Sequence, residues 1–348
     1  MTPQFINICG VSGGKDSIAT MLWMIYKSGY DPESLMFIFN DTQWEHPWTY
    51  RHLAWIHDNI HPIIWLRGER GFADLVKHKK RFPDPFRRFC TDWLKIRPTH
   101  EFQLWWLANG YQLVSHNGIR SGEKSSGPND RSLMTEWGED VVGATLRPKF
   151  AGYPIKVRRP LITWTIADVI GIHLEYNVPL NPLYALGFRR VGCMPCIMAN
   201  KKELRTISEQ FPERYEYLAQ LERDVNSNRE AQDGAHQTYA SFFQANAVPP
   251  RFRSLSIQKV IGKEADGSKK VTPLRTLNVP TVDDVRQWSL TGKGALPEQP
   301  VFDFGDIAQE TLLQQAARLM LSKDIGALEA MLADDNLSMG ACPKGYCE

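Results

Sequence analysis

Near its start the chain reads Phe5-Ile-Asn-Ile-Cys-Gly-Val11 and then Ser12-Gly-Gly-Lys-Asp-Ser17. An apolar run that passes through a glycine-rich turn into a helical pattern predicts a strand, a loop and a helix. Apolar residues at helical spacing support the helix, and Gly29 ends the pattern. The free N–H groups and the positive dipole end at a helix start attract anions. This stretch therefore predicts a phosphate-binding loop between a strand and a helix.

The residue types of this loop suit the phosphates of a nucleotide. Gly13 and Gly14 let the backbone fold around a phosphate, and Lys15 adds a mobile positive charge. Asp16 can hold a divalent metal, and Ser17 can donate a further hydrogen bond. The alternative is a strand–helix turn without a ligand. The candidate nucleotide-binding residues of the loop are Ser12, Gly13, Gly14, Lys15, Asp16 and Ser17, of which Lys15 and Asp16 are also candidate catalytic residues.

The first half of the chain alternates strand and helix patterns, which is typical of a parallel sheet covered by helices on both faces. The predicted strands cover residues 5–11, 35–40, 62–66 and 111–115. The predicted helices cover residues 16–28, 48–59, 99–108 and 165–176, and Thr165 and Asp168 form a capping box for the last. In such a doubly wound α/β sheet, ligands bind beyond the carboxyl ends of the strands, where Ser12 and Asp41 both lie.

The rest of the chain has weaker patterns. Residues 122–155 are rich in Gly, Ser and charge, and we expect a mobile loop there. Two helices are expected between residues 201 and 224, separated near Pro212, and the pattern then weakens from 230 to 300. We also expect helices at 307–321 and 325–332, followed by a flexible end. The predicted domains are an α/β domain over residues 1–200 and a mostly helical extension over residues 201–348.

The composition is that of a globular protein. The chain has 348 residues, of which 43% are hydrophobic and 23% charged. No apolar stretch reaches the length of a membrane span, and the first strand begins within five residues of the start. With no secretory signal, the six cysteines indicate thiols or metal ligands rather than disulfides. We therefore expect a cytoplasmic protein without a membrane contact.

Charge is unevenly distributed along the chain. Residues 67–97 hold ten Lys or Arg against four acidic residues, and residues 251–276 hold seven against two. From residue 277 onward the balance reverses, with eleven acidic and five basic residues. Basic clusters attract phosphates or nucleic acid, although many are only solvated faces. Nucleic acid is therefore a candidate partner.

Two further segments carry candidate nucleotide-binding residues. Asp41 ends the second predicted strand, where a carboxylate could receive the adenine or ribose, help to hold Mg²⁺, or cap the next helix. Gly118 and Arg120 follow the fourth predicted strand. An arginine suits phosphate or sulfate because its planar fork donates hydrogen bonds in pairs, although a surface arginine without a ligand is the alternative.

The cysteines suggest a metal or redox centre. Cys193-Met-Pro-Cys196 places two thiols at a spacing that can share a metal or cycle as a dithiol, and they can also be merely buried. Cys90 stands alone upstream, and Cys342 and Cys347 lie in the tail. Cys9 lies within the first predicted strand and is expected to belong to the core.

The loop resembles the PP-loop of the N-type ATP pyrophosphatases, whose fold is adenine nucleotide alpha hydrolase-like. Gly118-Ile-Arg120 and the segment from Arg159-Pro-Leu161 to Cys196 resemble the phosphoadenosine phosphosulfate (PAPS) reductase relatives of that superfamily. The resemblance covers residues 5 to 200. It implies that ATP is cut between the α- and β-phosphates, with Mg²⁺, to release pyrophosphate.

The same resemblance gives the cysteines roles. Members of the family with a [4Fe–4S] cluster use a Cys-Cys pair and a later Cys-x-x-Cys, whereas this chain matches only Cys90, Cys193 and Cys196. Three outcomes stay open, namely a cluster with one open iron, a fourth ligand from the tail, or no cluster. Reductases of the family carry a catalytic cysteine on the tail, for which Cys347 or Cys342 is the candidate, although the family's Glu-Cys-Gly-x-His ending is absent.

Two candidate functions follow from the resemblance, and a third belongs to another class of function. The first is an ATP pyrophosphatase that activates a substrate for sulfur transfer, similar in character to the ATP-hydrolysing proteins of DNA phosphorothioation systems. The intact Lys15 and Asp16 favour it, because they can stabilise the leaving pyrophosphate. The second is a PAPS or adenosine phosphosulfate reductase, and the third is a non-catalytic ATP-binding partner in a nucleic-acid-modifying complex, bound to its partner proteins.

Overall fold

The computed structural model describes residues 5–123, 130–144, 146, 151–233, 239–243, 248–259 and 275–291. The chain forms two compact units. Among the described residues, the first comprises those up to Gly71 together with Thr91–Cys193, and the second comprises Phe72–Cys90 and those from Met194 onward. The domain boundary expected at residue 200 stays a prediction. It lies close to the change from the first unit to the second between Cys193 and Met194. Residues 72–90 also belong to the second unit, so the chain passes between the two units more than once.

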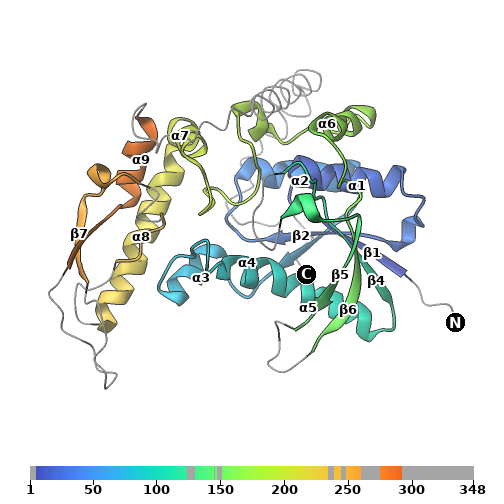
Figure 1. Ribbon diagram of the computed structural model, residues 1–348, viewed down its shortest axis with the longest axis horizontal. Helices are drawn as coiled ribbons and strands as arrows, with labels where there is room; N and C mark the ends of the chain where they lie inside the picture. Colours follow the sequence, from blue (N-terminus) through green and yellow to red (C-terminus); the bar gives the residue numbers. More distant parts are fainter. Residues whose placement is uncertain are drawn as a thin grey trace. The chain divides into compact units, whose positions relative to one another are not determined.

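The first unit is built on a six-stranded sheet (Figure 1). Its strands are β1 (Phe5–Gly10), β2 (Leu35–Asp41), β3 (Ile63–Arg67), β4 (Gln112–His116), β5 (Trp137–Val142) and β6 (Tyr153–Arg158). Their order is β3-β2-β1-β4-β6-β5, and every neighbouring pair is parallel except β5 with β6. In register, Cys9 of β1 faces Phe37 of β2 and His116 of β4. The predicted doubly wound α/β sheet is confirmed, with one antiparallel strand at its edge.

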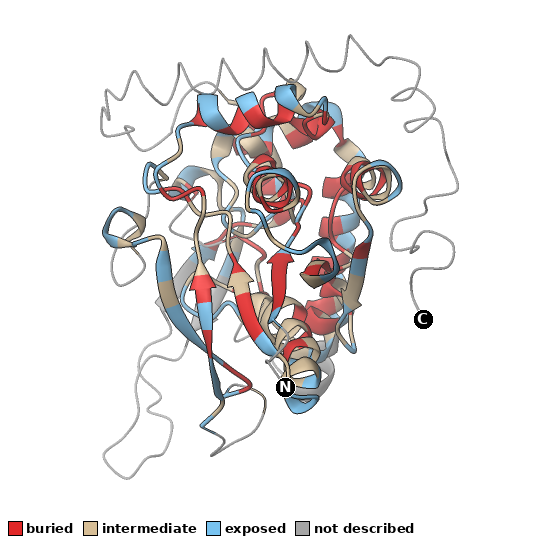
Figure 2. Ribbon diagram, turned by 90° about the vertical axis from the view of Figure 1, so that its right-hand side faces the viewer, coloured by how far each residue is buried: buried red, intermediate tan, exposed pale blue. Residues whose placement is uncertain are grey.

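Helices cover both faces of this sheet. Helices α1 (Lys15–Tyr26), α2 (Pro47–Asn59) and α6 (Ile166–Glu175) lie on one face, and α5 (Arg97–Ala108) lies on the other (Figure 1). Alternate residues of β1 serve the two sides, because side chains of a strand point to opposite faces. Cys9 joins the core beneath α1 and α2, whereas Ile6 and Ile8 join the core against α5. Figure 2 shows the buried residues concentrated along the strands and the inward faces of the helices.

The capping box predicted for α6 is confirmed. Asp168 N donates to Thr165 Oγ1 over 3.2 Å, and Thr165 N donates to Asp168 Oδ2 over 2.7 Å. The remaining short elements of the first unit are helical turns at Pro32–Ser34, Asp92–Ile96, Arg131–Leu133 and Pro182–Leu186. The three-residue helix α4 (Phe89–Thr91) begins in the second unit and continues directly into the turn at Asp92–Ile96.

The second unit is mostly helical. It contains α3 (Phe72–Lys79), α7 (Lys201–Gln210), α8 (Pro212–Asp233) and α9 (Val282–Leu290), with a turn at Pro250–Phe252 and a hairpin of β7 (Leu255–Lys259) and β8 (Arg275–Val279). Helices α7 and α9 pack against each other and against α8, which also packs against α3. Pro212 opens α8, as expected for a proline at a first helical position, and it separates the two predicted helices.

One prediction about an irregular segment is wrong. The mobile loop expected over residues 122–155 includes β5 and the start of β6, which extend the sheet. These strands bury little besides Val142, Ile155 and Val157, so their hydrophobic pattern is weak. The weakly patterned stretch from 230 to 300 contains the β7–β8 hairpin and α9. The helices expected at 307–321 and 325–332, and the flexible end, lie outside the described residues. Among the described helices, none has both the length and the apolar character needed to cross a bilayer.

A buried carboxylate in the second unit makes its stability depend on pH. Glu222 of α8 accepts hydrogen bonds from Phe242 N, Val282 N and the Tyr239 hydroxyl, each over 3.0 Å. Burial raises the pKa of Glu222 to about 7, even though these donors act to lower it. A carboxyl whose folded pKa lies above its unfolded value stabilises the fold at low pH, and this contribution is lost as pH rises through the folded pKa.

We therefore expect the free energy of unfolding to fall by about 2 to 3 kcal/mol between about pH 5 and pH 8 through this group. Urea unfolding at several pH values, followed by far-UV circular dichroism, measures the effect. In Glu222→Gln the titrating group is absent, so this part of the pH dependence should disappear. A wild-type protein equally stable at both pH values, or a variant with an unchanged slope, would contradict the prediction.

Candidate nucleotide site

The predicted phosphate loop connects β1 to α1 at a switch in strand order. From β1 the sheet continues to β2 on one side and to β4 on the other, and ligands of such sheets bind beyond the strand ends at this point. Gly13 has a φ of +72°, a conformation that side chains other than glycine rarely adopt. The Ser17 hydroxyl accepts from Ser12 N over 3.1 Å and donates to Gly14 O over 2.8 Å. Ser17 therefore braces the loop from inside.

Three charged side chains meet at the start of α1. Lys15 Nζ lies 2.7 Å from Asp16 Oδ2, and Arg120 Nε lies 2.6 Å from Asp16 Oδ1. Lys15 and Arg120 are buried, and burial alone would raise the pKa of the Asp16 carboxyl. The two adjacent cations outweigh that cost, so the net pKa of Asp16 is lowered and the group is ionised. Both oxygens of Asp16 are engaged by cations, so a resident Mg²⁺ does not fit this carboxylate as it stands.

Two more arginines belong to this charge cluster. Burial, and then the nearby Arg190 and Arg120, lower the pKa of Arg131, whereas Asp16 acts to raise it. Arg131 also forms an ion pair with Glu123. Among the described residues, these contacts link four cations, Lys15, Arg120, Arg131 and Arg190, with two carboxylates, Asp16 and Glu123. A surplus of two positive charges beside a helix N-terminus is an arrangement that binds a polyanion.

The backbone of Lys15 is held on both sides by residues that the sequence did not single out as site residues. Lys15 N donates to the Tyr184 hydroxyl over 3.0 Å, and Lys15 O lies 3.0 Å from His173 Nε2. Both partners are buried, and burial lowers the pKa of His173, although the contacts of its ring with Lys15 O and Val178 O act to raise it. Tyr184 ends the string Asn181-Pro-Leu-Tyr184, and Arg190 belongs to an Arg-Arg pair before Cys193, but their link to the loop is not visible in the sequence.

Gly118 is a packing residue of the same site. A Cβ atom added to it would lie 2.7 Å from Asp16 O and 2.7 Å from Thr20 Oγ1, closer than real Cβ contacts come. The absence of a side chain therefore lets the β4 loop touch the first turn of α1. This contact brings Arg120, two residues later, to Asp16. Gly118 thus permits the close packing of the loop on α1, and Arg120 supplies a positive charge to the site.

Asp41 lies at the end of β2 in a buried network. Its Oδ1 lies 2.8 Å from the Tyr50 hydroxyl, and its Oδ2 accepts from Arg67 Nη2 over 2.6 Å. Helix α2 is capped by His46, whose side chain accepts from Trp48 N, so Asp41 does not have the capping role. Burial and the carboxylates of Glu45 and Asp41 raise the pKa of Tyr50, which is therefore a proton donor. Nucleotide binding by Asp41 stays a prediction.

Cys193 lies beside the same network. Its Sγ donates to Glu45 Oε1 over 3.7 Å, and it lies 3.8 Å from Thr42 Oγ1. Thr42 Oγ1 in turn donates to Glu45 over 2.7 Å, and the backbones of Glu45 and Cys193 form an isolated β-bridge. Two residues earlier, Val191 O lies 3.7 Å from the position of a Cβ on Gly14. The segment that carries Cys193 therefore runs from the phosphate loop to the end of β2.

Of the other described cysteines, Cys9 belongs to the first unit, and Cys90 and Cys196 belong to the second. No group of three or more His, Cys, Asp or Glu side chains among the described residues is arranged to hold a metal ion. Cys196 is exposed. Cys9 is buried in β1, and burial raises its pKa to about 12, as expected for a core thiol. Cys342 and Cys347 lie outside the described residues. The [4Fe–4S] cluster stays a prediction.

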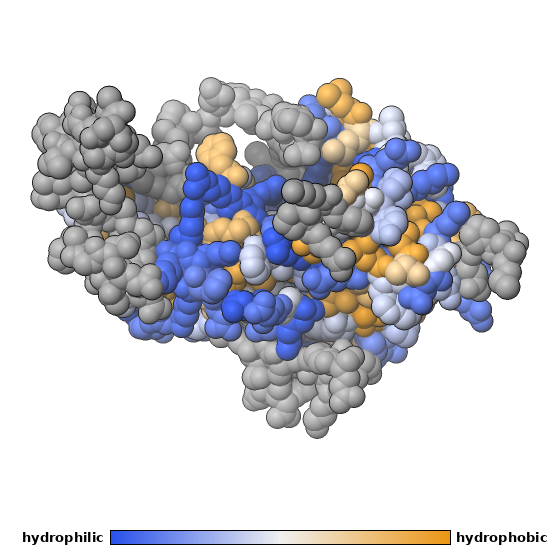
Figure 3. Space-filling model, turned by 90° about the horizontal axis from the view of Figure 1, so that it is seen from below, coloured by the Kyte–Doolittle hydropathy of each residue, from blue (hydrophilic) through white to orange (hydrophobic). Residues whose placement is uncertain are grey.

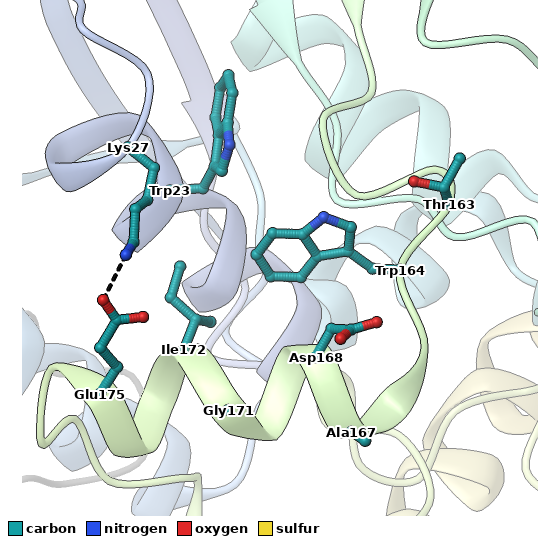
Figure 4. A pocket seen from close by; sticks show the side chains of 9 residues that line it. All are labelled: Trp23, Lys27, Thr163, Trp164, Ala167, Asp168, Gly171, Ile172 and Glu175. Carbon is teal, nitrogen blue, oxygen red and sulfur yellow. Dashed lines mark hydrogen bonds and ion pairs between the residues drawn. The ribbon is translucent and has the colours of Figure 1, made fainter.

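A surface pocket lies elsewhere on the first unit. It has a volume of about 760 Å³ and is lined by residues of α1 and of α6 with its preceding loop (Figure 4). Trp23 and Trp164 line it, and a Lys27–Glu175 ion pair crosses it. Trp23 follows Lys15 by eight helical residues, a rise of about 12 Å, and no residue of the charge cluster lines the pocket. The pocket is therefore not part of the phosphate site.

Comparison with known proteins agrees with this description. The family model of the phosphoadenosine phosphosulfate reductase domain matches residues 7–199, more than half of the chain. An uncharacterized 37.8 kDa protein of Escherichia phage 186 is 27% identical over 267 residues, which is 63% of this chain and 75% of the phage protein. An adenosine 5'-phosphosulfate reductase of Burkholderia cepacia is 48% identical over 40 residues, only 12% of this chain and 16% of that enzyme.

Among solved structures, the chain is similar to a phosphoadenylyl-sulfate reductase of Candida auris in its phosphate complex. The identity is 21%, and the match covers 56% of this chain and 82% of that chain with a TM-score of 0.36.

Proposed function

Because the chain belongs to the phosphoadenosine phosphosulfate reductase domain family, we propose that its loop binds ATP and cleaves it to AMP and pyrophosphate. The cleavage would activate an acceptor for sulfur transfer. One observation carries the proposal, namely the gathering of Lys15, Arg120, Arg131 and Arg190 at the start of α1. A reductase needs only to bind the phosphates of its substrate, whereas a pyrophosphatase must also stabilise the negative charge that develops on the leaving pyrophosphate.

The protein's own residues would act by exchange of partners. In the described structure Lys15 and Arg120 share the single carboxylate of Asp16, and a bound polyphosphate offers both cations stronger partners. The two side chains would then move onto the phosphates without crossing the site, because they already lie against the loop. The Tyr184 and His173 contacts hold the Lys15 backbone in place during this exchange. Mg²⁺ enters as part of the ATP substrate complex.

The proposed acceptor chemistry rests on Cys193. A thiol held by Glu45 and Thr42, on the segment that passes the phosphate loop, lies where a sulfur species and an adenylated acceptor could meet. The proposed acceptor class is nucleic acid, with DNA phosphorothioation as the specific case and partner proteins of such a system as further components. A cluster on Cys90, Cys193 and Cys196 is a separate proposal, and no step here depends on it.

The products of ATP turnover test this function. Purified protein incubated with ATP and Mg²⁺ should release pyrophosphate and AMP in equal amounts, measured by a coupled pyrophosphate assay and by chromatography of the nucleotides. Addition of the true acceptor should raise the rate. Release of ADP and phosphate instead, or no turnover with any acceptor tried while ATP binds, would contradict the cleavage chemistry and favour a non-catalytic ATP-binding role.

A second function is supported by the family itself and by the short match to the Burkholderia cepacia enzyme. In it, the charge cluster binds PAPS or adenosine phosphosulfate, and Cys347 attacks the sulfur. The bond between this sulfur and the phosphate oxygen breaks, the adenosine phosphate leaves, and thioredoxin then reduces the S-sulfocysteine to release sulfite. Sulfite release from either sulfonucleotide in the presence of thioredoxin would establish this reductase. A Cys347→Ser variant should then lose the activity, whereas it should leave ATP cleavage unchanged.

A further inference from the structure

The segment between α3 and α4 in the second unit forms a well-braced turn. Helix α3 ends at Lys79, and Lys80 adopts a positive φ of 53° that redirects the chain. Asp84 Oδ1 then accepts from Phe86 N over 2.9 Å and from Arg87 N over 2.8 Å. Asp84 Oδ2 accepts from Arg81 Nη2 over 2.8 Å, and the backbones of Asp84 and Arg87 pair with each other. The turn is therefore fixed by its own hydrogen bonds.

One aromatic ring of this turn is buried, and another is exposed. Phe82, at its base, is 4% exposed and meets the ring of Phe242 edge to face at 5.4 Å. Phe86, at its tip, is 94% exposed, the largest exposed fraction among the exposed large hydrophobic residues that the structure describes. Figure 3 shows one face of the molecule, on which groups of hydrophobic residues stand among hydrophilic ones. A phenylalanine held out by a braced turn is available to stack on a partner at little cost in ordering.

The charge around this ring is strongly positive. Residues 72–90 hold six Lys or Arg against two Asp, a balance of +4. Arg81 is paired with Asp84, and Lys77 with Asp224. Arg87 and Arg88, directly after Phe86, are exposed, and within the described part of the chain neither guanidinium has an ion-pair partner. These two charges are therefore available to an anionic partner.

We propose that this turn, residues 82–88, binds single-stranded nucleic acid. Phe86 stacks on one base, and Arg87 and Arg88 contact the phosphates on either side of it. The partner is single-stranded because base faces are covered in a duplex, whereas a fixed, exposed ring needs an open face. A protein partner would also use an exposed ring, but it would not require adjacent uncompensated cations. The inference concerns binding alone and holds whether or not the loop cleaves ATP.

Fluorescence anisotropy of the full-length chain with a labelled oligothymidylate tests the proposal, with an unlabelled duplex of equal length as competitor. Phe86→Ala should weaken binding about tenfold or more, because one base stack is lost. Phe86→Tyr should bind like the wild type, and Phe86→Leu should bind as weakly as Phe86→Ala. Trp105→Ala is the matched control, since Trp105 is an exposed aromatic residue, 58% exposed, on α5 of the first unit.

The arginines have a separate signature. The double variant with Arg87→Gln and Arg88→Gln should lower the slope of log affinity against log salt concentration by about 1.4, at about 0.7 for each lost phosphate contact. Phe86→Ala should leave this slope unchanged. The ATP cleavage rate without nucleic acid should be unaffected in every variant, which separates this proposal from the proposed function. Wild-type affinity in Phe86→Ala overturns the proposal, as does no binding by the wild type. Wild-type affinity in Phe86→Leu also overturns it, because it indicates an apolar contact such as a protein partner makes.

Discussion

Lys15→Ala should lower the rate of pyrophosphate release from ATP by about 10²- to 10³-fold, with a smaller effect on ATP affinity. The lysine is buried at the first position of α1, and its Nζ is 2.7 Å from Asp16 Oδ2. It is the one cation of the cluster that belongs to the loop itself, so its charge would act where the pyrophosphate leaves. Removing it subtracts an interaction made mainly in the transition state, which lowers kcat more than it raises KM.

Lys27→Ala is the matched control for this variant. Lys27 lies just after α1, and its ion pair with Glu175 is largely exposed. An exposed pair contributes little to stability, so this variant should fold like the wild type. Because Lys27 lies at the opposite end of α1 from Lys15, it should also cleave ATP like the wild type. Circular dichroism should show that both variants are folded, because Asp16 keeps Arg120 as a partner when Lys15 is removed. Pyrophosphate release at the wild-type rate in Lys15→Ala would contradict the proposed role of Lys15 in ATP cleavage.

Gly118→Ala should have the second largest effect, through backbone displacement. The new Cβ would meet Asp16 O and Thr20 Oγ1 at 2.7 Å each, and the first of these is backbone that cannot rotate away. Either the β4 loop or the first turn of α1 must move, and Arg120 would move off Asp16. A misplacement of about 1 Å at a reacting site costs about 10²-fold in rate. Overpacking of this kind also costs about 1 to 3 kcal/mol of stability.

Gly122→Ala tests whether the effect is specific to that contact. Gly122 lies in the same loop, and a Cβ on it would meet nothing within 4 Å. The thermal stability and the rate of ATP cleavage of Gly122→Ala should therefore match those of the wild type. The two alanine variants are compared in thermal unfolding and in the pyrophosphate assay. Equal behaviour of the two variants would show that close packing at Gly118 does not position the site.

The β1–loop–α1 unit could be predicted from the sequence because its signals are local. A short apolar run, two glycines and a helical repeat within residues 5–25 each constrain only their neighbours in the chain. The capping box of Thr165 and Asp168 and the helix break at Pro212 are local in the same sense, and the structure has both. Strands β5 and β6 escaped prediction, because they lie at one end of the sheet and bury few side chains.

The distant residues that join Lys15 and Asp16 in the candidate site could not be predicted in this way. Lys15 is separated from Tyr184 by 169 positions and from His173 by 158, yet both hold its backbone. No periodicity encodes such a pair, and Arg190 has no sequence signal beyond its neighbouring arginine. The same holds for Cys193, which the sequence pairs with Cys196 by spacing, whereas its thiol lies against Glu45 and Thr42.

The sequence by itself determined that a strand, a glycine-rich loop and a helix place Lys15 and Asp16 side by side at the start of the helix, because these residues are adjacent in the chain. Only the tertiary structure decided which other charges join them. The strand order places β4 next to β1, and the close approach at Gly118 then brings Arg120 onto Asp16. Such contacts depend on how distant segments pack, and packing is a property of the whole sheet and its helices rather than of any one stretch.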